Sequence, residues 1–334
     1  MSQSKRLAPL LQRPTVTDRI DTCLHALLTR FRRQRPLRSG SLLVTILGDS
    51  IAPRGGRIAL GSLIRLAAPF GLPERLVRTS VARLAQEGWL GAVRSGRNSE
   101  YRLTERGRSS FAAATRRIYG GRAQPWNGRW TLVILPLPAR ARHGPRAGLR
   151  EELRWLGFGQ FAPAVWGHPS ALAADMRARL TEVAHGEGLL LMQAMNAEAS
   201  EDRRLVDAGW DLAELAQGYR RFVGAFSPAR EALRVNGSLS PGAAFALRTL
   251  LIHEYRKIHL RDPLLPAVLL PQNWIGASAY ELCQELYRSV FGAAERHLFL
   301  QAETLAGPLP ALSAEARRRF RSKARKKLRS DSPG

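Results

Sequence analysis

The residues of this sequence that could do chemistry are mostly basic, and they gather in two stretches far apart along the chain. The first is LPERLVRTSVARLAQEGWL, over residues 72–90, and the second is HEYRKIHLRDP, over residues 253–263. Arginine binds phosphates through paired charged hydrogen bonds, and in the major groove of DNA it can pair with guanine in the same way. Both stretches therefore indicate binding to a polyanion.

The first stretch has the pattern of an amphipathic helix with arginines on its outer arc. Val77, Val81, Leu84 and Ala85 recur on one face, which predicts that this face anchors the helix to a core. Acids stand only at the two ends of the stretch. The alternative is an ordinary solvated face, since arginine-rich helices are common. The DNA contacts predicted on this arc are Arg75, Arg78, Thr79 and Arg83.

The elements predicted around this helix follow the order of a winged helix. Residues 40–107 predict a helix, a short strand, a second helix, a turn, the arginine-bearing helix, and two strands joined across GRN. In a helix-turn-helix, the second helix of the pair enters the major groove. The hairpin would then be a wing that reaches phosphates or the minor groove. Its predicted DNA contacts are Arg94, Arg97 and Asn98.

The second stretch predicts a site for the phosphates of an anionic ligand. Its predicted ligand contacts are His253, Arg256, Lys257, His259 and Arg261. A solvated basic edge and a patch beside DNA phosphates are alternatives that the sequence leaves open. A zinc site is not indicated, because the six-residue spacing of the histidines does not place both on one helix face.

Charge and composition narrow the class of partner. The 334 residues include 52 Lys and Arg against 27 Asp and Glu, which gives a net charge of +25. Such an excess favours nucleic acid first, an anionic membrane surface second and an acidic ligand third, with an arginine-rich proteome as the alternative. No apolar run is long enough for a signal peptide or a membrane span, so we expect a cytoplasmic protein without a membrane partner. Cys23 and Cys283 have no metal or disulfide spacing.

The pattern along the chain predicts an α+β protein of several parts. These are a basic N-terminal arm or helix over 1–39, the winged helix over 40–120, a ferredoxin-like domain over 121–200, a helical ligand-binding and dimerisation domain over 201–302, and a basic disordered tail over 303–334. The helix predicted from Thr17 could lie on DNA or pack on a neighbouring domain. The tail is expected to bind phosphates nonspecifically.

The middle domain is predicted from strands and helices in the order strand, helix, strand, strand, helix, strand. This scaffold can host a nuclease, but metal-assisted hydrolysis needs carboxylates that converge on a cation. The first strand ends in Leu135, Pro136 and Leu137, with no acid among them, and His168 and His185 are isolated. We therefore predict a structural or dimerising module, no metal, no cofactor and no enzyme activity.

Several motifs together resemble the phenylacetate-degradation repressor (PaaX) family. They are LGDSIAPRGGRIALGSL, ERLVRTSVARLAQEGWL, SGRNSEYRLTERG, WNGRW, LRWLGFGQFAPAVWGHPS and LLIHEYRKIHLRDPLLPAVLLPQNWIG. The resemblance runs from Gly40 to about Arg288 and leaves out the basic ends. It implies a GntR-like winged helix, a Cas2-like middle domain and a helical C-terminal domain. By the same resemblance, residues 74–83 would be the recognition helix and residues 94–98 the wing.

The resemblance also implies a function. Members of this family are homodimers that repress genes of aerobic phenylacetate catabolism and leave DNA on binding phenylacetyl-coenzyme A. We therefore expect a bacterial, nucleoid-associated repressor that binds an inverted-repeat operator in double-stranded DNA and responds to an aryl acyl-coenzyme A effector. The alternative is a basic structural protein that coats nucleic acid without strong sequence preference.

Overall fold

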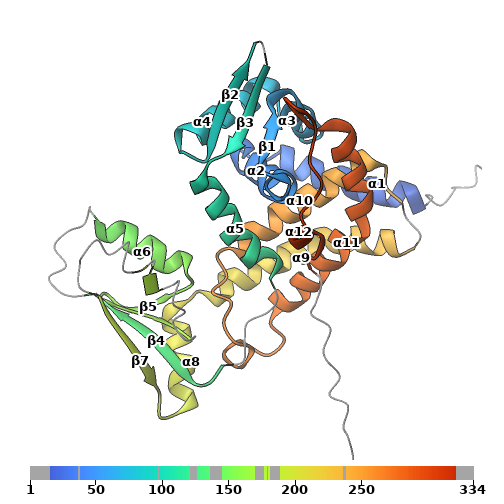
Figure 1. Ribbon diagram of the computed structural model, residues 1–334. Helices are drawn as coiled ribbons and strands as arrows, with labels where there is room; N and C mark the ends of the chain where they lie inside the picture. Colours follow the sequence, from blue (N-terminus) through green and yellow to red (C-terminus); the bar gives the residue numbers. More distant parts are fainter. Residues whose placement is uncertain are drawn as a thin grey trace, which may run out of the picture.

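The computed structural model shows a helix-rich body from which a smaller part containing a sheet projects (Figure 1). The structure describes residues 16–36, 38–96, 98–120, 126–135, 145–169, 177–178, 180, 189–235 and 238–320. Arg97, His185 and residues 321–334 lie outside this part. None of the helices in the described part combines the length and the apolar character that crossing a bilayer requires.

The N-terminal unit contains the elements predicted up to residue 103 and one further helix. In chain order they are α2 (Ser39–Ile46), β1 (Arg57–Ala59), α3 (Leu60–Ala67), α4 (Glu74–Gln86), β2 (Leu90–Ser95), β3 (Asn98–Leu103) and α5 (Glu105–Tyr119). Gly55 and Gly56, with φ of 87° and 71°, make the turn into β1 that other residues adopt only with strain. The strands lie antiparallel in the order β1-β3-β2.

Helix α5 was not predicted, although its sequence carries a start signal. The Thr104 side chain accepts a hydrogen bond from the backbone amide of Gly107 at 3.0 Å, which caps the helix. Phe111 and Ile118, seven residues apart, are buried on its inner face. Figure 1 shows α5 running from the strands of the N-terminal unit toward the projecting middle part.

The middle part is built on an antiparallel sheet. Its elements are β4 (Arg129–Ile134), α6 (Pro145–Trp155), β5 (Gly159–Ala162), β6 (Val165–His168), β7 (Leu190–Met195) and α8 (Ala199–Gly209). The strand order is β5-β6-β4-β7. Along β4, Val133 belongs to the core that includes Leu149 and Leu153 of α6. Trp130 faces the other side, where its ring nitrogen donates to Asp202 of α8 at 2.7 Å.

The C-terminal helices share one hydrophobic core with the N-terminal unit. These helices are α9 (Leu212–Arg234), α10 (Pro241–His259) and α11 (Ile275–Gln301). Helix α1 (Val16–Arg32) packs on α9 and α10, and Ile20, Leu24, Leu27 and Phe31 are part of this core. The N-terminal helix thus takes the second of the two placements that the sequence left open, because its apolar stripe is buried on a neighbouring domain.

A buried charge network joins the N-terminal unit to these helices. Asp49 lies 3.1 Å from Arg248 of α10 and 3.0 Å from Arg319, and it accepts hydrogen bonds from the hydroxyl groups of Tyr119 and Tyr287. Arg248, 1% exposed, also pairs with Glu295 of α11 at 2.7 Å. Burial alone would raise the pKa of Asp49, but the two arginines and the tyrosine hydrogen bonds hold that pKa below its usual value. The network therefore fixes the N-terminal unit against α10 and α11.

The prediction of a disordered tail from residue 303 is wrong for residues 303–320. These residues form β8 (Glu303–Thr304), β9 (Gly307–Pro308) and α12 (Ala314–Arg317), and they lie across the N-terminal unit. The Leu305 amide donates to Glu100 at 2.9 Å, and the Ser313 amide donates to the Pro53 carbonyl at 3.0 Å. Phe320 is buried against Tyr119, and Arg319 pairs with Asp49. The basic composition of the tail could not show that Arg319 has a buried counterion in Asp49.

Candidate nucleic-acid interface and basic pocket

Helix α4 exposes its arginines while its apolar face lies in the core. Val77, Val81 and Leu84 are buried, at the spacing that anchors one face of a helix. Ser80 is also buried, and its hydroxyl lies 2.9 Å from that of Ser39 in α2. The exposed arc carries all four contacts predicted on this helix, namely Arg75, Arg78, Thr79 and Arg83.

Two of these arginines form ion pairs within their own helix. Arg78 lies 2.7 Å from Glu74, and Arg83 lies 2.8 Å from Glu87. The arginine side chains remain 56% and 79% exposed. Exposed pairs of this spacing contribute about 0.3–0.5 kcal/mol, which is less than an arginine gains from a base or a phosphate. The pairs therefore leave both guanidinium groups available to a polyanion.

The hairpin of β2 and β3 projects from the same unit (Figure 1). Its strands pair up to Ser95 and Asn98, and Gly96 turns with φ of 56°. Arg94 and Asn98, two of the predicted wing contacts, are exposed beside this tip. Arg97, the third, lies outside the described residues.

A buried acid holds the base of the hairpin. Glu100 of β3 accepts hydrogen bonds from Arg57 at 2.9 Å, Arg102 at 2.7 Å and the Leu305 amide at 2.9 Å. Burial alone would raise the pKa of Glu100, but these hydrogen bonds lower it to about 2. The carboxylate thus stays ionised and ties the hairpin to the segment that follows α11.

The five basic residues predicted to hold a ligand, four on α10 and Arg261 just after it, do not form one surface. His253 is 0% exposed, and its Nδ1 lies 3.1 Å from the Thr45 hydroxyl. Arg256 donates to the Ser41 carbonyl at 2.7 Å and to Thr45 at 2.8 Å. His259 is buried, and its Nε2 lies 3.0 Å from the Arg117 carbonyl. The expectation of a shared ligand surface is corrected, because these three side chains pack α10 against the N-terminal unit.

The two buried histidines are neutral at pH 7. Burial, helped by the positive charges of Arg256 and Lys257, lowers the pKa of His253 well below its usual value. Burial also lowers the pKa of His259, although the nearby carboxylate of Asp262 opposes this shift. Neither ring therefore supplies a positive charge for an anion at neutral pH.

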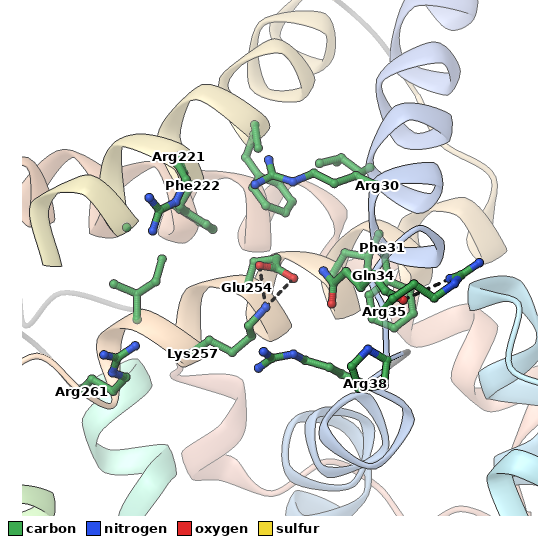
Figure 2. Close-up of a pocket in the computed structure, with 17 residues that line it drawn as sticks. Arg30, Phe31, Gln34, Arg35, Arg38, Arg221, Phe222, Glu254, Lys257 and Arg261 are labelled. Atoms are coloured by element: carbon green, nitrogen blue, oxygen red, sulfur yellow. Dashed lines mark hydrogen bonds and ion pairs between the residues drawn. The ribbon is translucent and has the colours of Figure 1, made fainter. Parts of the chain in front are cut away.

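Lys257 and Arg261 instead line a cavity between α1, α9 and α10, which we call the basic pocket (Figure 2). Its volume is about 490 Å³. Its basic lining residues are Arg30, Arg35, Arg38, Arg221, Lys257 and Arg261. Glu254 is the one acid among the described lining residues, and it accepts a hydrogen bond from Lys257 at 3.0 Å. Phe31, Phe222 and Phe226 add buried aromatic surface.

This chemistry suits anions rather than cations. Guanidinium and ammonium groups from three separate segments converge on one hollow, an arrangement that favours phosphate or carboxylate groups. In the described part of the chain, no three or more His, Cys, Asp and Glu side chains gather as they would to hold a metal ion.

Comparison with known proteins identifies the family. Three family models match in chain order: the PaaX-like protein over residues 38–107, the PaaX protein central Cas2-like domain over 123–206, and the PaaX-like protein C-terminal domain over 210–299. The transcriptional repressor PaaX of Escherichia coli (strain K12) is 36% identical over 280 residues, which are 83% of this chain and 88% of that protein. The chain belongs to the PaaX family.

A solved structure of a mycobacterial protein also shows a likeness to this PaaX family member. It is the uncharacterized protein Rv0674 from Mycobacterium tuberculosis, at 26% identity and a TM-score of 0.43, covering 71% of this chain and 88% of that chain.

The family matches contain α4 and the hairpin but only part of the basic pocket. Arg221, Lys257 and Arg261 lie within the PaaX C-terminal match, and Arg38 is the first residue of the N-terminal match. Arg30 and Arg35 lie outside the matched ranges. The sequence showed a basic run at FRRQRP but gave no sign that it faces α9, about 190 residues away, so these lining residues were missed.

Proposed function

We propose that this PaaX family member is a DNA-binding transcriptional repressor and that residues 38–107 form its winged helix. The element order and the sheet order β1-β3-β2 support this arrangement, as does the similarity to the transcriptional repressor of E. coli. The observation that carries the proposal is the two-faced helix α4, which buries Val77, Val81 and Leu84 and exposes its arginines. In such a unit, this helix enters the major groove.

The proposal includes the partners that the family resemblance implies. The protein would act as a homodimer on an inverted-repeat operator, with half-sites about one helical turn apart or a multiple of it. An aryl acyl-coenzyme A, with phenylacetyl-coenzyme A as the leading candidate, would release it from DNA. Release requires that the effector bind the DNA-free conformation more tightly, by about 1–3 kcal/mol or more. The middle domain, whose strand order β5-β6-β4-β7 supports a ferredoxin-like arrangement, would be structural and not enzymatic.

Footprinting and titration on the DNA around the protein's own gene test this proposal. A regulator gives a symmetric footprint and binds that site about 10³-fold or more tightly than random duplex at physiological salt. Phenylacetyl-coenzyme A at saturating concentration should weaken operator binding by about fivefold or more. A protein that shows neither specific binding at a symmetric site nor release by phenylacetyl-coenzyme A would contradict the proposal.

The net charge of +25 favours a second candidate, a basic protein that coats nucleic acid. A coating protein would bind operator and random duplex with similar affinity and would leave no symmetric footprint. The ratio of the two affinities therefore separates the candidates. A ratio near one would replace the repressor with the coating protein.

A further inference from the structure

We propose that the basic pocket binds the phosphate groups of a small organic ligand that also carries an apolar or aromatic group. The pocket lies between α1 on one side and α9 and α10 on the other (Figure 2). Figure 2 shows Arg30 and Arg38 extending from the α1 side toward Arg221 and Lys257.

The charge of the pocket is only partly compensated by the protein. Lys257 pairs with Glu254 at 3.0 Å, and Arg261 pairs with Glu214 at 2.9 Å. Within the described part of the chain, Arg30, Arg38 and Arg221 have no acid at ion-pair distance. Like charges that face one hollow repel each other, and an anion that bridges them removes this repulsion while it accepts charged hydrogen bonds. Two or more phosphates on one ligand would meet these three arginines.

The shape of the pocket favours a small ligand over duplex DNA. Its volume of about 490 Å³ lies in the range of about 300–1,000 Å³ that small-molecule pockets occupy. Phe31 and Phe222 lie at the floor of the pocket, 2% and 3% exposed, and the partly buried Ala225 and Ile258 add apolar surface next to the charged groups. A hollow with apolar lining can receive a ring or an acyl chain, whereas the DNA backbone offers only phosphate and sugar. The lining thus predicts a ligand with both kinds of group.

Contacts through α2 also connect the surroundings of the pocket to α4. Arg38 directly precedes α2, where the Ser39 hydroxyl lies 2.9 Å from Ser80 of α4. Arg256 of α10 donates at 2.7 Å to the carbonyl of Ser41, which also lies in α2. A ligand bound by Arg38, Arg221 and Lys257 together would therefore change the contacts among α2, α4 and α10. Identification of this ligand with the aryl acyl-coenzyme A effector rests on the proposed function, but phosphate binding in the pocket does not.

Isothermal titration calorimetry of the full chain tests the inference. The probes are phenylacetyl-coenzyme A, coenzyme A, adenosine diphosphate and inorganic triphosphate. The test variant is the double substitution Arg30→Ala, Arg221→Ala, since both side chains are exposed and outside the buried network. The matched control is Arg203→Ala, Arg204→Ala, which removes two exposed charges from α8. Circular dichroism and thermal melting verify that each variant folds.

At least one probe should bind the wild-type chain, and the pocket variant should weaken that binding by about tenfold or more. The control should change it by less than about twofold. If adenosine diphosphate or triphosphate binds in this way but phenylacetyl-coenzyme A neither binds nor releases DNA, the pocket stands and the effector part of the proposed function fails.

Three results would overturn the inference. The first is that no phosphate probe binds the wild-type chain at millimolar concentration. The second is that the folded pocket variant binds every probe as well as the wild type. The third is that the pocket variant loses duplex affinity and salt dependence but keeps probe binding, which would make this surface a contact for DNA phosphates.

Discussion

Helices α4 and α10 both carry several basic residues but use them in opposite ways. On α4, Arg78 and Arg83 are more than half exposed and pair only with acids of their own helix. On α10, Arg248 is 1% exposed and His253 is 0% exposed, and both contact residues of the N-terminal unit. One helix leaves its charge exposed to solvent, and the other uses its charge to join two parts of the chain.

The comparison shows that what surrounds a basic residue decides its role more than the local sequence does. Arg248 has acids on two sides, buried Asp49 and partly buried Glu295, which lie far apart along the chain. A buried ion pair adds little net stability when it is complete, but removal of one partner leaves an uncompensated charge. An exposed ion pair adds little stability, and removal of one partner costs little.

The largest expected difference concerns Asp49. Asp49→Asn should lower the free energy of unfolding by about 3–5 kcal/mol, because Arg319 would keep a buried charge without its acid and Arg248 would keep only Glu295. The control, Glu105→Gln, removes an acid that pairs with exposed Arg108 and should change the same quantity by less than about 1 kcal/mol. Urea unfolding followed by circular dichroism measures both. Equal effects would show that the Asp49 network is no more structural than a surface pair.

The second prediction compares the stability effect of one arginine on α10 with that of one arginine on α4. Arg256→Ala should destabilise the protein by about 1–3 kcal/mol, because its partners Ser41 and Thr45 would be left without their donor. Arg78→Ala should cost no more than about 0.5 kcal/mol, since it removes only an exposed pair. Thermal melting measures the loss of stability in each variant. A larger loss for Arg78→Ala than for Arg256→Ala would contradict this account of α10.

The buried histidines predict a dependence of stability on pH. Burial lowers the pKa of His168 from 6.5 to about 4, and it lowers the pKa of His253 and His259 in the same direction. Below pH 6.5 the unfolded chain therefore binds protons that the folded chain excludes, so the free energy of unfolding falls between pH 6.5 and 4. His168 should account for up to about 3 kcal/mol of this fall. His168→Gln should flatten the curve, and an unchanged curve would exclude His168 as a source.

The smallest expected effect comes from the acids of α4. Glu74→Gln with Glu87→Gln should change stability by less than about 1 kcal/mol, since each exposed pair contributes about 0.3–0.5 kcal/mol. Duplex affinity should rise slightly, because two negative charges leave the face proposed to meet DNA. Fluorescence anisotropy with labelled duplex measures the change. A weaker affinity would mean that the ion pairs position the arginines for DNA.

Much of the fold could be predicted from local patterns. The apolar spacing of α4 and the alternation in β2 and β3 depend on residues that are close in sequence. Patterns along the chain also predicted the order of the domains, and the family resemblance added that the middle domain is Cas2-like. The structure bears out the exposure of Arg75, Arg78, Thr79 and Arg83.

The rest depends on contacts that local patterns do not contain. His253 and His259 read as ligand residues because their partners, Thr45 and the Arg117 carbonyl, lie about 200 and 140 residues away along the chain. The order of residues 303–320 depends on Asp49 as the counterion of Arg319 and on Glu100 as the acceptor for the Leu305 amide, which composition alone could not indicate. For the same reason, the sequence could not show that Arg30 faces Arg221 across one cavity.

The central claim, that the exposed face of α4 meets DNA, is tested most directly by the salt dependence of duplex affinity. The triple variant Arg75→Ala, Arg78→Ala, Arg83→Ala is compared with the wild type and with Arg203→Ala, Arg204→Ala. The account predicts that binding weakens by about 1–3 kcal/mol for each arginine that reads a base. It also predicts that the slope of log affinity against log salt flattens by about 0.9 for each phosphate that the variant no longer neutralises. A folded triple variant with wild-type affinity and slope would contradict it.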